Sequence, residues 1–559
     1  MKTYLFLLLI CLFAAQQATG QSGKTFHISG DLGISTEFYD FSTNDSTLHP
    51  RRPDFNYRLF FNPIFHFGDK ISLPVNLVAT KRFSNAYLPL PSYDNPLQSL
   101  TNPNNAIGLH PTFGWATFHL GSHTADFSEL STGNLPVFGA GVDLRPGVLR
   151  LAYTYGVQQW ALRPDTTLQL SGNYQRRFQA LKLGVGYGNS YFGINTAKVE
   201  DVVSSVDPVT RLPHPQEGAL ATLEAAFEFS QHVKAKAEAG ASAFTKNTFD
   251  DKVEDTKISN FPEYLFTARQ SSRLDYASTF SIEANYKNWG LALRRKKLGA
   301  GYEPLGFGFV ETDVLDLTAS PRLQLFQNKF LLNATIGQRT DNLSHTKLST
   351  TKRLIASGNM MAIFSKSFSL SANYSNYGAR NNVANDTLRL EFVSRNLAVT
   401  PVLRIQRNDL SHTLSFTFGL SDFDDKNLFS GELATNRTQT LSSSYTFARR
   451  QFTVVATGSY MQNDRSTGAL DIRTLMLQPG YGFLKRKLNI STGLVWSVIG
   501  QEGYTDSRRF VLRPRVRWRL TKQLTFDAQG SLNIYRYGSI HPGAMYDESY
   551  LQTGLTQRF

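Results

Sequence analysis

The chain has 559 residues, of which 13% are aromatic and only 18% are charged, with a formal net charge of +14. This length would allow two or three soluble domains, but side-chain polarity alternates with a period of two along most of the chain, and helical periodicity is rare. The pattern excludes a mainly helical protein and predicts an all-β one. No recognised nucleic-acid-binding module appears, so the positive charge does not indicate nucleic acid as a partner.

Residues 1–20 have the features of a cleaved secretory signal peptide. Lys2 supplies the positive charge and residues 5–14 form a short apolar run. Ala18-Thr19-Gly20 places small residues ahead of a cleavage site before Gln21. The apolar run is too short to be a membrane helix. We therefore expect export through the Sec pathway.

The single cysteine, Cys11, lies inside this segment. A lipoprotein would need a small residue before the cysteine, and Ile10 stands there instead. We expect the mature chain to hold no thiol, which excludes a disulfide, a Cys-ligated metal and a Cys nucleophile. Without Lys2 it carries 57 basic against 44 acidic residues, a net charge of +13. That charge fits either a basic wall with solvated loops, or a lumen or loops that attract anions such as lipopolysaccharide phosphate.

Alternating segments begin after the signal and continue to the end, so residues 21–559 are predicted to form one barrel domain. Following the alternation gives about 26 strands, within a range of 22 to 26, with both termini at the same end. In the less regular first half, strands are predicted to begin near residues 25, 56, 71, 109, 124, 134, 147, 166, 179, 217, 233, 271, 289 and 306. The longer connections cover about 40–55, 84–108, 199–216, 247–270, 342–351 and 422–434.

In the second half, pairs of strands are joined by turns of two to four polar or basic residues. Such short connections make the flanking strands antiparallel neighbours. We expect these turns to face the periplasm and the longer loops to face outward. The six turns are centred on Gln327-Asn328-Lys329, Ser365-Lys366-Ser367, Asn408-Asp409, Arg449-Arg450, Lys485-Arg486-Lys487 and Thr521-Lys522-Gln523.

The strands after these turns have one apolar and one polar face. In residues 411–420, for example, the even positions are apolar or aromatic apart from His412, and the odd positions are Ser, Thr or Gly. Such polar faces suit a wet lumen better than the dry core of a sandwich, and the apolar faces then suit lipid. An aromatic girdle is predicted near the short turns from Phe326, Phe330, Phe364, Phe368, Phe447, Phe452, Phe483 and Trp518.

Four descending strands contain a proline: Pro321, Pro401, Pro479 and Pro514. Proline cannot donate to a strand ladder and is usually confined to edges or bulges. Its recurrence near the short-turn end predicts bulges, or a rim where the pairing changes. We interpret these prolines as structural devices rather than as a site.

The sharpest local pattern is a ladder of Arg513, Arg515, Arg517 and Arg519. These arginines alternate with Leu, Pro, Val, Trp and Leu at positions 512 to 520, so one face of the strand is cationic and the other apolar. Asp527, inward on the next strand, is placed to pair with one of them. The ladder either forms an anion-attracting strip in a channel, or belongs to a salt-bridge network that braces the wall.

Catalytic and metal-binding patterns are weak. His119 and His123, with Asp126 nearby, have a spacing that converges on a helix but need not converge on a strand, so no metal site is predicted. The acidic residues at 422, 424 and 425 resemble a calcium loop only faintly, because Lys426 occupies a ligand position and no glycine follows it. No G-x-S-x-G or phosphate-loop motif occurs. We expect no enzyme activity and no cofactor.

With its signal peptide, alternating hairpins and terminal Phe559, the chain resembles the large outer-membrane β-barrels of Gram-negative bacteria, and its richness in Asn, Tyr and Phe is similar to barrels of the Bacteroidota. This resemblance implies that Phe559, with Leu555 in phase, is an assembly signal read by the barrel-assembly machinery. Gln557 departs from the aromatic found there in many members. TonB-dependent receptors and the lipopolysaccharide-export barrel are similar in size, but each has an N-terminal domain that this sequence does not show.

The prediction is therefore one closed antiparallel transmembrane barrel in the Gram-negative outer membrane. A barrel of more than 20 strands encloses more space than side chains fill. We expect a channel or translocation barrel with a polar, basic lumen that passes or gates solutes or a partner chain. The alternative is a non-conducting surface barrel whose loops bind a partner in adhesion or scaffolding. Expected partners are outer-membrane lipid, lipopolysaccharide, the assembly machinery and a periplasmic or surface protein.

Overall fold

The protein is seen in a computed structural model that describes residues 26–82, 105–164, 171–206, 212–253, 265–303, 311–382, 390–427 and 434–559. The predicted signal peptide and most of the predicted 84–108 loop lie outside the described residues. In the described part there is one short 3-10 helix, η1 (Val203–Ser205), and no helix is long and apolar enough to cross a membrane.

All other regular structure consists of strands. Their bounds are β1 (Phe26–Thr43), β2 (Phe55–Phe67), β3 (Ile71–Arg82), β4 (Ala106–Leu109), β5 (Thr112–Phe113), β6 (Ala116–Ala125), β7 (Leu135–Leu144), β8 (Leu149–Gln159), β9 (Gln175–Tyr187), β10 (Ser190–Val202), β11 (Glu217–Glu228), β12 (Val233–Thr245), β13 (Ser272–Asn285), β14 (Trp289–Leu298), β15 (Val314–Leu325), β16 (Phe330–Asp341), β17 (Thr351–Ile363), β18 (Phe368–Asn381), β19 (Glu391–Arg407), β20 (Leu410–Asp425), β21 (Asn436–Arg449), β22 (Phe452–Arg465), β23 (Leu470–Phe483), β24 (Leu488–Gln501), β25 (Ser507–Arg519), β26 (Leu524–Arg536) and β27 (Met545–Arg558).

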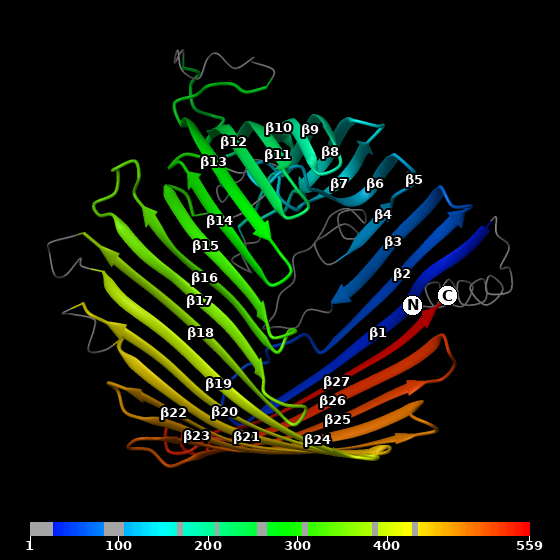
Figure 1. Cartoon of the computed structure of the whole chain (residues 1–559), viewed down its shortest axis with the longest axis vertical. Coiled ribbons are helices and arrows are strands. Elements are labelled where there is room, and N and C mark those ends of the chain that lie inside the picture. The colour runs from blue at the N-terminus through cyan, green and yellow to red at the C-terminus, as the bar shows by residue number, and fades with distance from the viewer. Residues whose placement is uncertain are drawn as a thin grey trace.

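These strands close into one antiparallel barrel, which confirms the predicted fold (Figure 1). Each strand pairs with its neighbours along the chain, and β1 also pairs with β27. β4 and β5 together fill one place between β3 and β6, so the barrel has 26 strands. The last residue completes the closure, because Phe559 and Gly30 exchange two backbone hydrogen bonds of 3.0 and 3.1 Å.

The two faces of the wall differ as the alternation predicts. On the outer face, large apolar side chains are exposed around the whole circumference, for example Phe118 on β6, Leu293 on β14, Phe418 on β20 and Trp496 on β24. An exposed apolar surface of this extent is typical of a barrel in contact with lipid. Several members of the predicted girdle are exposed beside the short turns: Phe326, Phe364, Phe368, Phe452, Phe483 and Trp518.

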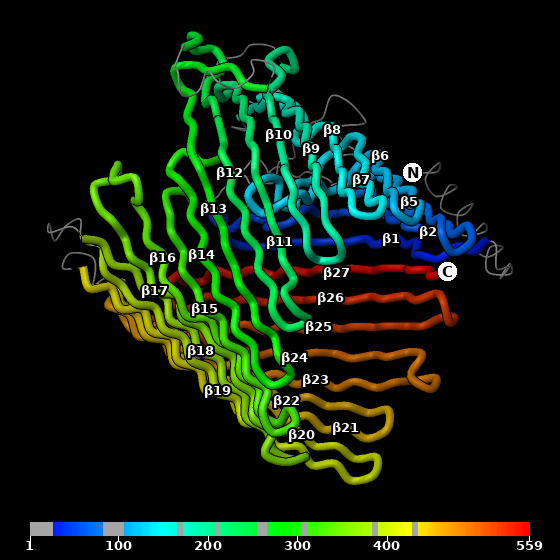
Figure 2. The backbone as a smooth tube through the Cα atoms, turned by 45° about the horizontal axis from the view of Figure 1, so that its top comes forward, coloured from blue at the N-terminus to red at the C-terminus, as the bar shows by residue number. Residues whose placement is uncertain are grey.

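The short turns and both ends of the barrel lie where the sequence predicts. All six predicted turns connect consecutive strands from β15 to β26. Several turn residues adopt positive φ, such as Asn408 (φ 51°) and Arg450 (φ 50°), as tight hairpins require. Figure 2 shows the hairpins of β19 to β26 along one rim, with the C-terminus at the same rim.

Four of the predicted strand starts in the first half are wrong. Strands were expected near residues 124, 166, 179 and 306, whereas they begin at 116, 175, 190 and 314. The error near 179 has a clear cause, because Gly188, at φ 58°, makes a two-residue turn between β9 and β10. Across this turn Tyr187 pairs with Ser190, so the outward positions change from odd on β9 to even on β10, and this change of phase is the only mark that the turn leaves on the alternation.

Of the two outcomes predicted for the prolines, bulges are not found, and the pairing is interrupted beside each proline instead. At Pro514 the pairing of β25 with β26 stops after Leu512 and resumes at Arg515, with the same register on both sides. The ladders after Pro321, Pro401 and Pro479 are interrupted in the same way. Each proline therefore costs a local gap in the ladder, as expected from its missing N–H, but shifts no strand.

One part of the barrel is bent around a narrow arc. Figure 1 shows β7 to β11 crowded on this arc, whereas β16 to β27 form a broad wall. Where this arc begins, Gly108, Gly121, Gly139 and Gly156 lie opposite one another in register across β4, β6, β7 and β8. A Cβ added at any of them would lie 2.1 to 2.6 Å from a backbone oxygen of a neighbouring strand. Only glycine permits this close approach, so the glycine row makes the sharp curvature possible.

Replacing Gly139 by alanine should destabilise the barrel, because the new methyl group meets backbone atoms that cannot move independently. Overpacking of this kind costs about 1–3 kcal/mol. The matched control is Gly419→Ala, where the nearest atom to the added Cβ is 3.5 Å away. Urea unfolding in detergent, followed by the heat-modifiable shift on a gel, should give a lower free energy of unfolding for Gly139→Ala only. Equal stability of the two variants would contradict the role of the glycine row.

Candidate functional site

The lumen is narrowed by a segment that folds into it, which we call the inward loop (residues 126–134, between β6 and β7). Its main anchor is the carboxylate of Glu238 on β12, which accepts a 2.6 Å hydrogen bond from the Ser128 hydroxyl and a 3.3 Å bond from the Leu130 N–H. The hydroxyl of Tyr302, from the segment that follows β14, donates to the Leu130 carbonyl over 2.6 Å. Burial raises the pKa of Tyr302 far above its usual value, which keeps this donor protonated.

A buried ion pair fixes the beginning of the inward loop. Lys182 on β9 donates to the carbonyl of Phe127 over 2.7 Å and lies 2.5 Å from Glu224 on β11. Glu224 is only 1% exposed, and it also accepts a 3.0 Å hydrogen bond from the Tyr191 hydroxyl. Breaking a buried pair of this kind by removing one partner costs about 3–5 kcal/mol. The loop is therefore a fixed part of the lumen.

The tip of the inward loop carries a charge that the wall neutralises. Glu129 forms ion pairs with Arg294 and Lys296 of β14, the latter at 3.0 Å. Burial alone would raise the pKa of Glu129, but hydrogen bonds and positive charges from Lys296 and Arg294 outweigh burial and lower the pKa. The carboxylate is thus ionised at neutral pH, and the tip is held across the lumen to β14.

Apolar packing supports these polar anchors. Phe127 and Leu130 are buried in two separate clusters of inward-facing side chains. The first cluster joins β6 to β11 on the narrow arc through Ala125, Leu135, Val137, Ala152, Phe178, Ala180, Ala197, Val199 and Leu220. Sequence reasoning missed the inward loop, because these residues show neither alternation nor a motif, and their partners lie about 50 to 170 residues away.

The broad wall opposite has a different lining. From β15 to β24 its inner face carries hydroxyl pairs across neighbouring strands, such as Ser320–Thr335 (3.0 Å) and Thr400–Thr417 (3.0 Å). Amide side chains of Asn333, Asn359 and Asn373 stand in register on β16, β17 and β18. Uncharged groups that donate and accept hydrogen bonds suit a surface that water and polar solutes pass over.

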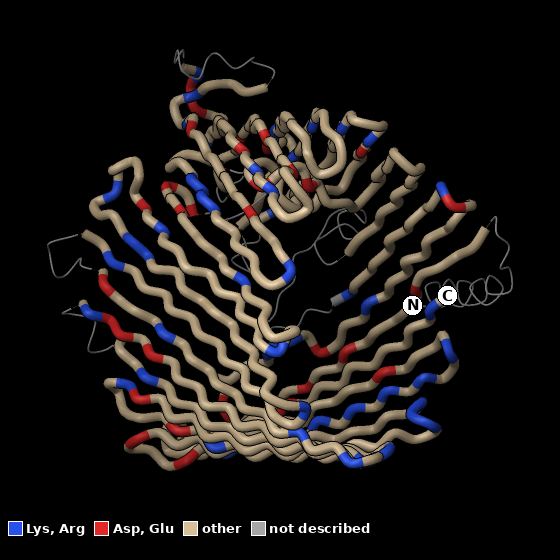
Figure 3. Tube along the Cα trace, viewed as in Figure 1, with Lys and Arg blue, Asp and Glu red and all other residues tan. Residues whose placement is uncertain are grey.

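The arginine ladder lies on β25, on the inner face of this broad wall. Arg517 contacts Asp527 of β26 at 2.9 Å, and Arg515 lies 3.6 Å from the same carboxylate. Arg513 and Arg519 make no ion pair with any described residue. One carboxylate therefore serves two of the four arginines, and this strip keeps a net positive charge. Figure 3 shows basic positions following one another along this part of the wall.

The two residues of the predicted assembly signal lie at the closing seam. Leu555 is on the outer face of β27, opposite Ile34 of β1. The ring of Phe559 lies 6.5 Å from the ring of Phe61 on β2. Their recognition by assembly machinery stays a prediction.

Three histidines come together on the inner face, although the sequence suggested no convergence. The rings of His119 and His123 stack with centroids 5.2 Å apart, on either side of Gly121, whose φ of 87° departs from regular strand geometry. His110, which the sequence did not single out, lies between β4 and β5, with its Nδ1 3.2 Å from Nδ1 of His119. Asp126 begins the inward loop. Within the described residues no group of three or more His, Asp or Glu side chains has the arrangement of a metal site.

No family model and no curated protein matches the sequence. Among solved structures, OccAB4 of Acinetobacter baumannii is 14% identical, with a TM-score of 0.30, over 66% of this chain and 97% of that one. A mutant ferric enterobactin receptor (PfeA) of Pseudomonas aeruginosa is 9% identical, with a TM-score of 0.41, over 96% and 81%. The P pilus usher (PapC) translocation pore is 10% identical, with a TM-score of 0.36, over 95% and 99%.

These TM-scores are all below 0.5, so the fold is defined by the strand pairing of this chain itself. The closed ladder and the exposed apolar outer face identify a large β-barrel of the outer-membrane type.

Proposed function

We propose that the protein is a channel of the Gram-negative outer membrane, with a basic lumen that favours anions. One observation carries the proposal: Arg515 and Arg517 face the lumen, yet their side chains are 49% and 59% exposed. Ionised guanidinium groups are this exposed only where water surrounds them, because burying a charge without full compensation is costly. The lumen along β25 is therefore hydrated.

The route that we propose runs along the broad wall. The inward loop occupies the side of the lumen next to β9, β12 and β14, where it is tied to Lys182, Glu238 and Lys296. The hydroxyl and amide lining of β15 to β24 and the arginine ladder lie on the remaining side. A polar solute with negative charge would meet hydrogen-bonding groups and a positive strip along this path. In this proposal the inward loop sets the width of the channel.

The location and partners belong to the same proposal. We place the apolar outer face in the outer membrane. This location implies export by the Sec pathway, insertion by the barrel-assembly machinery through Phe559 and Leu555, and contact with lipopolysaccharide. No described feature selects a periplasmic or surface partner protein.

Single-channel recording of the purified mature protein in a planar bilayer tests the proposal. We expect discrete conductance steps, and a reversal potential in a KCl gradient that indicates a preference for chloride. Heat-modifiable mobility on a gel controls for correct folding. Folded protein that gives no steps would exclude an open channel and favour the non-conducting surface barrel, whose loops would then be screened for a partner.

A further inference from the structure

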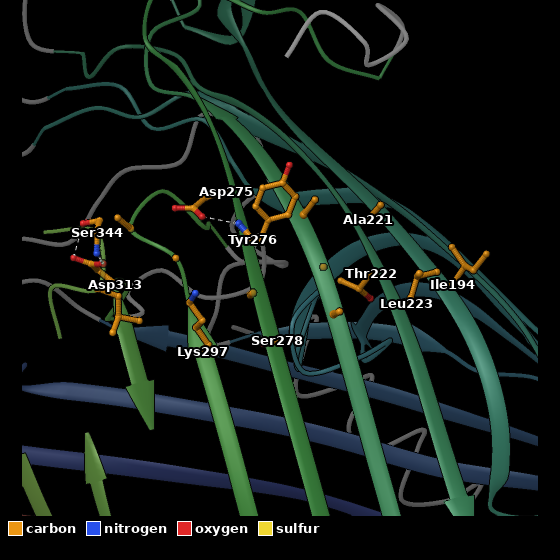
Figure 4. A pocket seen from close by; sticks show the side chains of 17 residues that line it. Ile194, Ala221, Thr222, Leu223, Asp275, Tyr276, Ser278, Lys297, Asp313 and Ser344 are labelled. Carbon is orange, nitrogen blue, oxygen red and sulfur yellow. Dashed lines mark hydrogen bonds between the residues drawn. The ribbon is translucent and has the colours of Figure 1, made fainter. Parts of the chain in front are cut away.

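The outer face of β12 is made of alanine. Its outward positions are Ala235, Ala237, Ala239, Ala241 and Ala243, while the inward positions include Lys234, Lys236 and Glu238. Ala219 and Ala221 extend this surface onto β11. Taller side chains border it, with Ile194 and Leu223 on one side and Tyr276 on the other. The result is a trough across β10 to β13, which we call the outer-wall groove (Figure 4).

The upper end of the groove is filled by the protein itself. Phe266, from the connection between β12 and β13, is only 2% exposed because it packs on Ala219 and Ala243. Further down, the same alanine surface is left uncovered by the described residues, and its borders are open, with Tyr276 63% and Leu223 51% exposed. An apolar side chain thus already occupies one end of this trough, and the remainder offers the same surface to a second apolar group.

Two basic side chains stand beside the groove on the lipid-facing surface. On β14 the outward positions are apolar up to Leu293 and then become Arg295 and Lys297. Arg295 donates a hydrogen bond of 3.4 Å to the hydroxyl of Ser278, and neither basic residue forms an ion pair with a described residue. Among other arginines of the outer face, Arg536 pairs with Asp547 at 2.8 Å, whereas Arg380 and Arg508 form no ion pair with a described residue.

Two carboxylates also line the groove, and both are already satisfied. Asp313 is buried and accepts hydrogen bonds of 2.9 and 3.0 Å from the N–H and hydroxyl of Ser344. Asp275 accepts backbone hydrogen bonds from Gly301 (2.8 Å) and Tyr276 (2.7 Å). Figure 4 shows Asp275 and Tyr276 on opposite sides of their strand. The carboxylates thus face the loops, which leaves Lys297 to meet an anion from the membrane side.

We propose that the outer-wall groove binds a phosphorylated, multi-chain lipid of the outer leaflet, with phosphate on Arg295 and Lys297 and acyl chains along the alanines. Neighbouring strands are about 4.8 Å apart, so Ile194 on β10 and Tyr276 on β13 project from strands about 14 Å apart, with the alanines of β11 and β12 between them. Tyr276 is four residues from the long-loop end of β13, and Lys297 is one residue from the end of β14. In the strand register Lys297 is level with Ser278 and Ala239, and Arg295 is level with Phe280 and Ala237, so the basic pair stands beside the alanine surface. A phosphate gains charge-assisted hydrogen bonds from both cations.

The test is native mass spectrometry of the folded barrel after incubation with hexa-acyl diphosphoryl lipid A, phosphatidylglycerol or phosphatidylcholine. We expect lipid A to be retained most, at least about tenfold more than phosphatidylcholine, a difference of about 1.4 kcal/mol. The Arg295→Ala/Lys297→Ala variant should lose that preference. Ala239→Leu/Ala241→Leu, which fills the trough with lipid-facing leucines, should lower lipid A retention while both cations stay in place.

The matched control is Lys352→Ala/Arg380→Ala, which removes two exposed cations from the adjacent strands β17 and β18, away from the alanine surface. It should retain lipid A as the unmodified protein does. An equal loss in this control, retention by the leucine-filled variant, or equal binding of phosphatidylglycerol and lipid A would each overturn the proposal. Gel mobility before and after heating checks that every variant is folded. The outcome does not depend on whether the barrel conducts.

Discussion

Replacing the inward loop by a two-residue turn should increase the single-channel conductance by roughly twofold or more, because conductance follows the open section of a pore. The change removes residues 127–133 and joins Asp126 to Asn134 through Asn-Gly. The geometry permits it, since Ala125 and Leu135 are paired neighbours at the ends of β6 and β7, and Asn-Gly favours the tight turn that such a hairpin needs. Recordings in the same salt as for the unmodified protein measure the effect.

A point variant tests the anchoring of the inward loop while the loop itself stays in place. Glu238→Gln keeps the volume of the side chain but weakens the acceptor for Ser128 and Leu130, so the loop should fluctuate and the open-channel current should become noisier. Glu228→Gln is the matched control, because Glu228 lies at the other end of the neighbouring strand β11 and pairs with Lys234 instead. An unchanged conductance in the loop-shortened barrel would show that the inward loop does not limit the pore.

Reversing two charges of the arginine ladder should reverse the ion preference of the channel. In Arg515→Glu/Arg517→Glu the strip changes by four charges and Asp527 loses both partners. Each charge contributes about 1 kcal/mol to the electrostatic energy of a permeating ion 4 Å away in water. We therefore expect the anion-to-cation permeability ratio to change by at least about tenfold. The reversal potential in a KCl gradient gives this ratio. Arg508→Glu, on the outer face of the same strand, is the control that should leave the ratio unchanged.

Asp527→Asn distinguishes the two interpretations of the ladder. If the ladder attracts anions, freeing Arg515 and Arg517 strengthens the preference for chloride. If the ladder braces the wall, the variant lowers the free energy of unfolding and leaves the selectivity as it was. The half-exposed guanidinium groups favour the first result, because ion pairs in such contact with water contribute about 0–1 kcal/mol to stability.

The fold could be predicted in advance because it depends on a local rule. Successive side chains of a strand point to opposite faces, so a wall between lipid and water leaves an alternation in every strand, as on β20 and β24. The short turns of the second half are equally local. The prediction failed near Gly188, where only a change of the outward positions from odd to even marks the turn. At the prolines the sequence left bulges and a change of pairing open, and the structure shows interrupted pairing.

The candidate site was predictable only where it lies on one strand. The arginine ladder is visible in the sequence because its four members are neighbours on β25, and Asp527 follows on the adjoining strand. The inward loop gave no signal, because Lys182, Glu238 and Tyr302 reach it from strands and loops far along the chain. The contact of His110 with His119 and the alignment of the glycine row could not be predicted either, because both depend on the register between strands. The sequence by itself determined that this chain closes into a membrane barrel with a polar interior. Only the tertiary structure decided which part of that interior is filled, because the filling is made by contacts that no local pattern encodes.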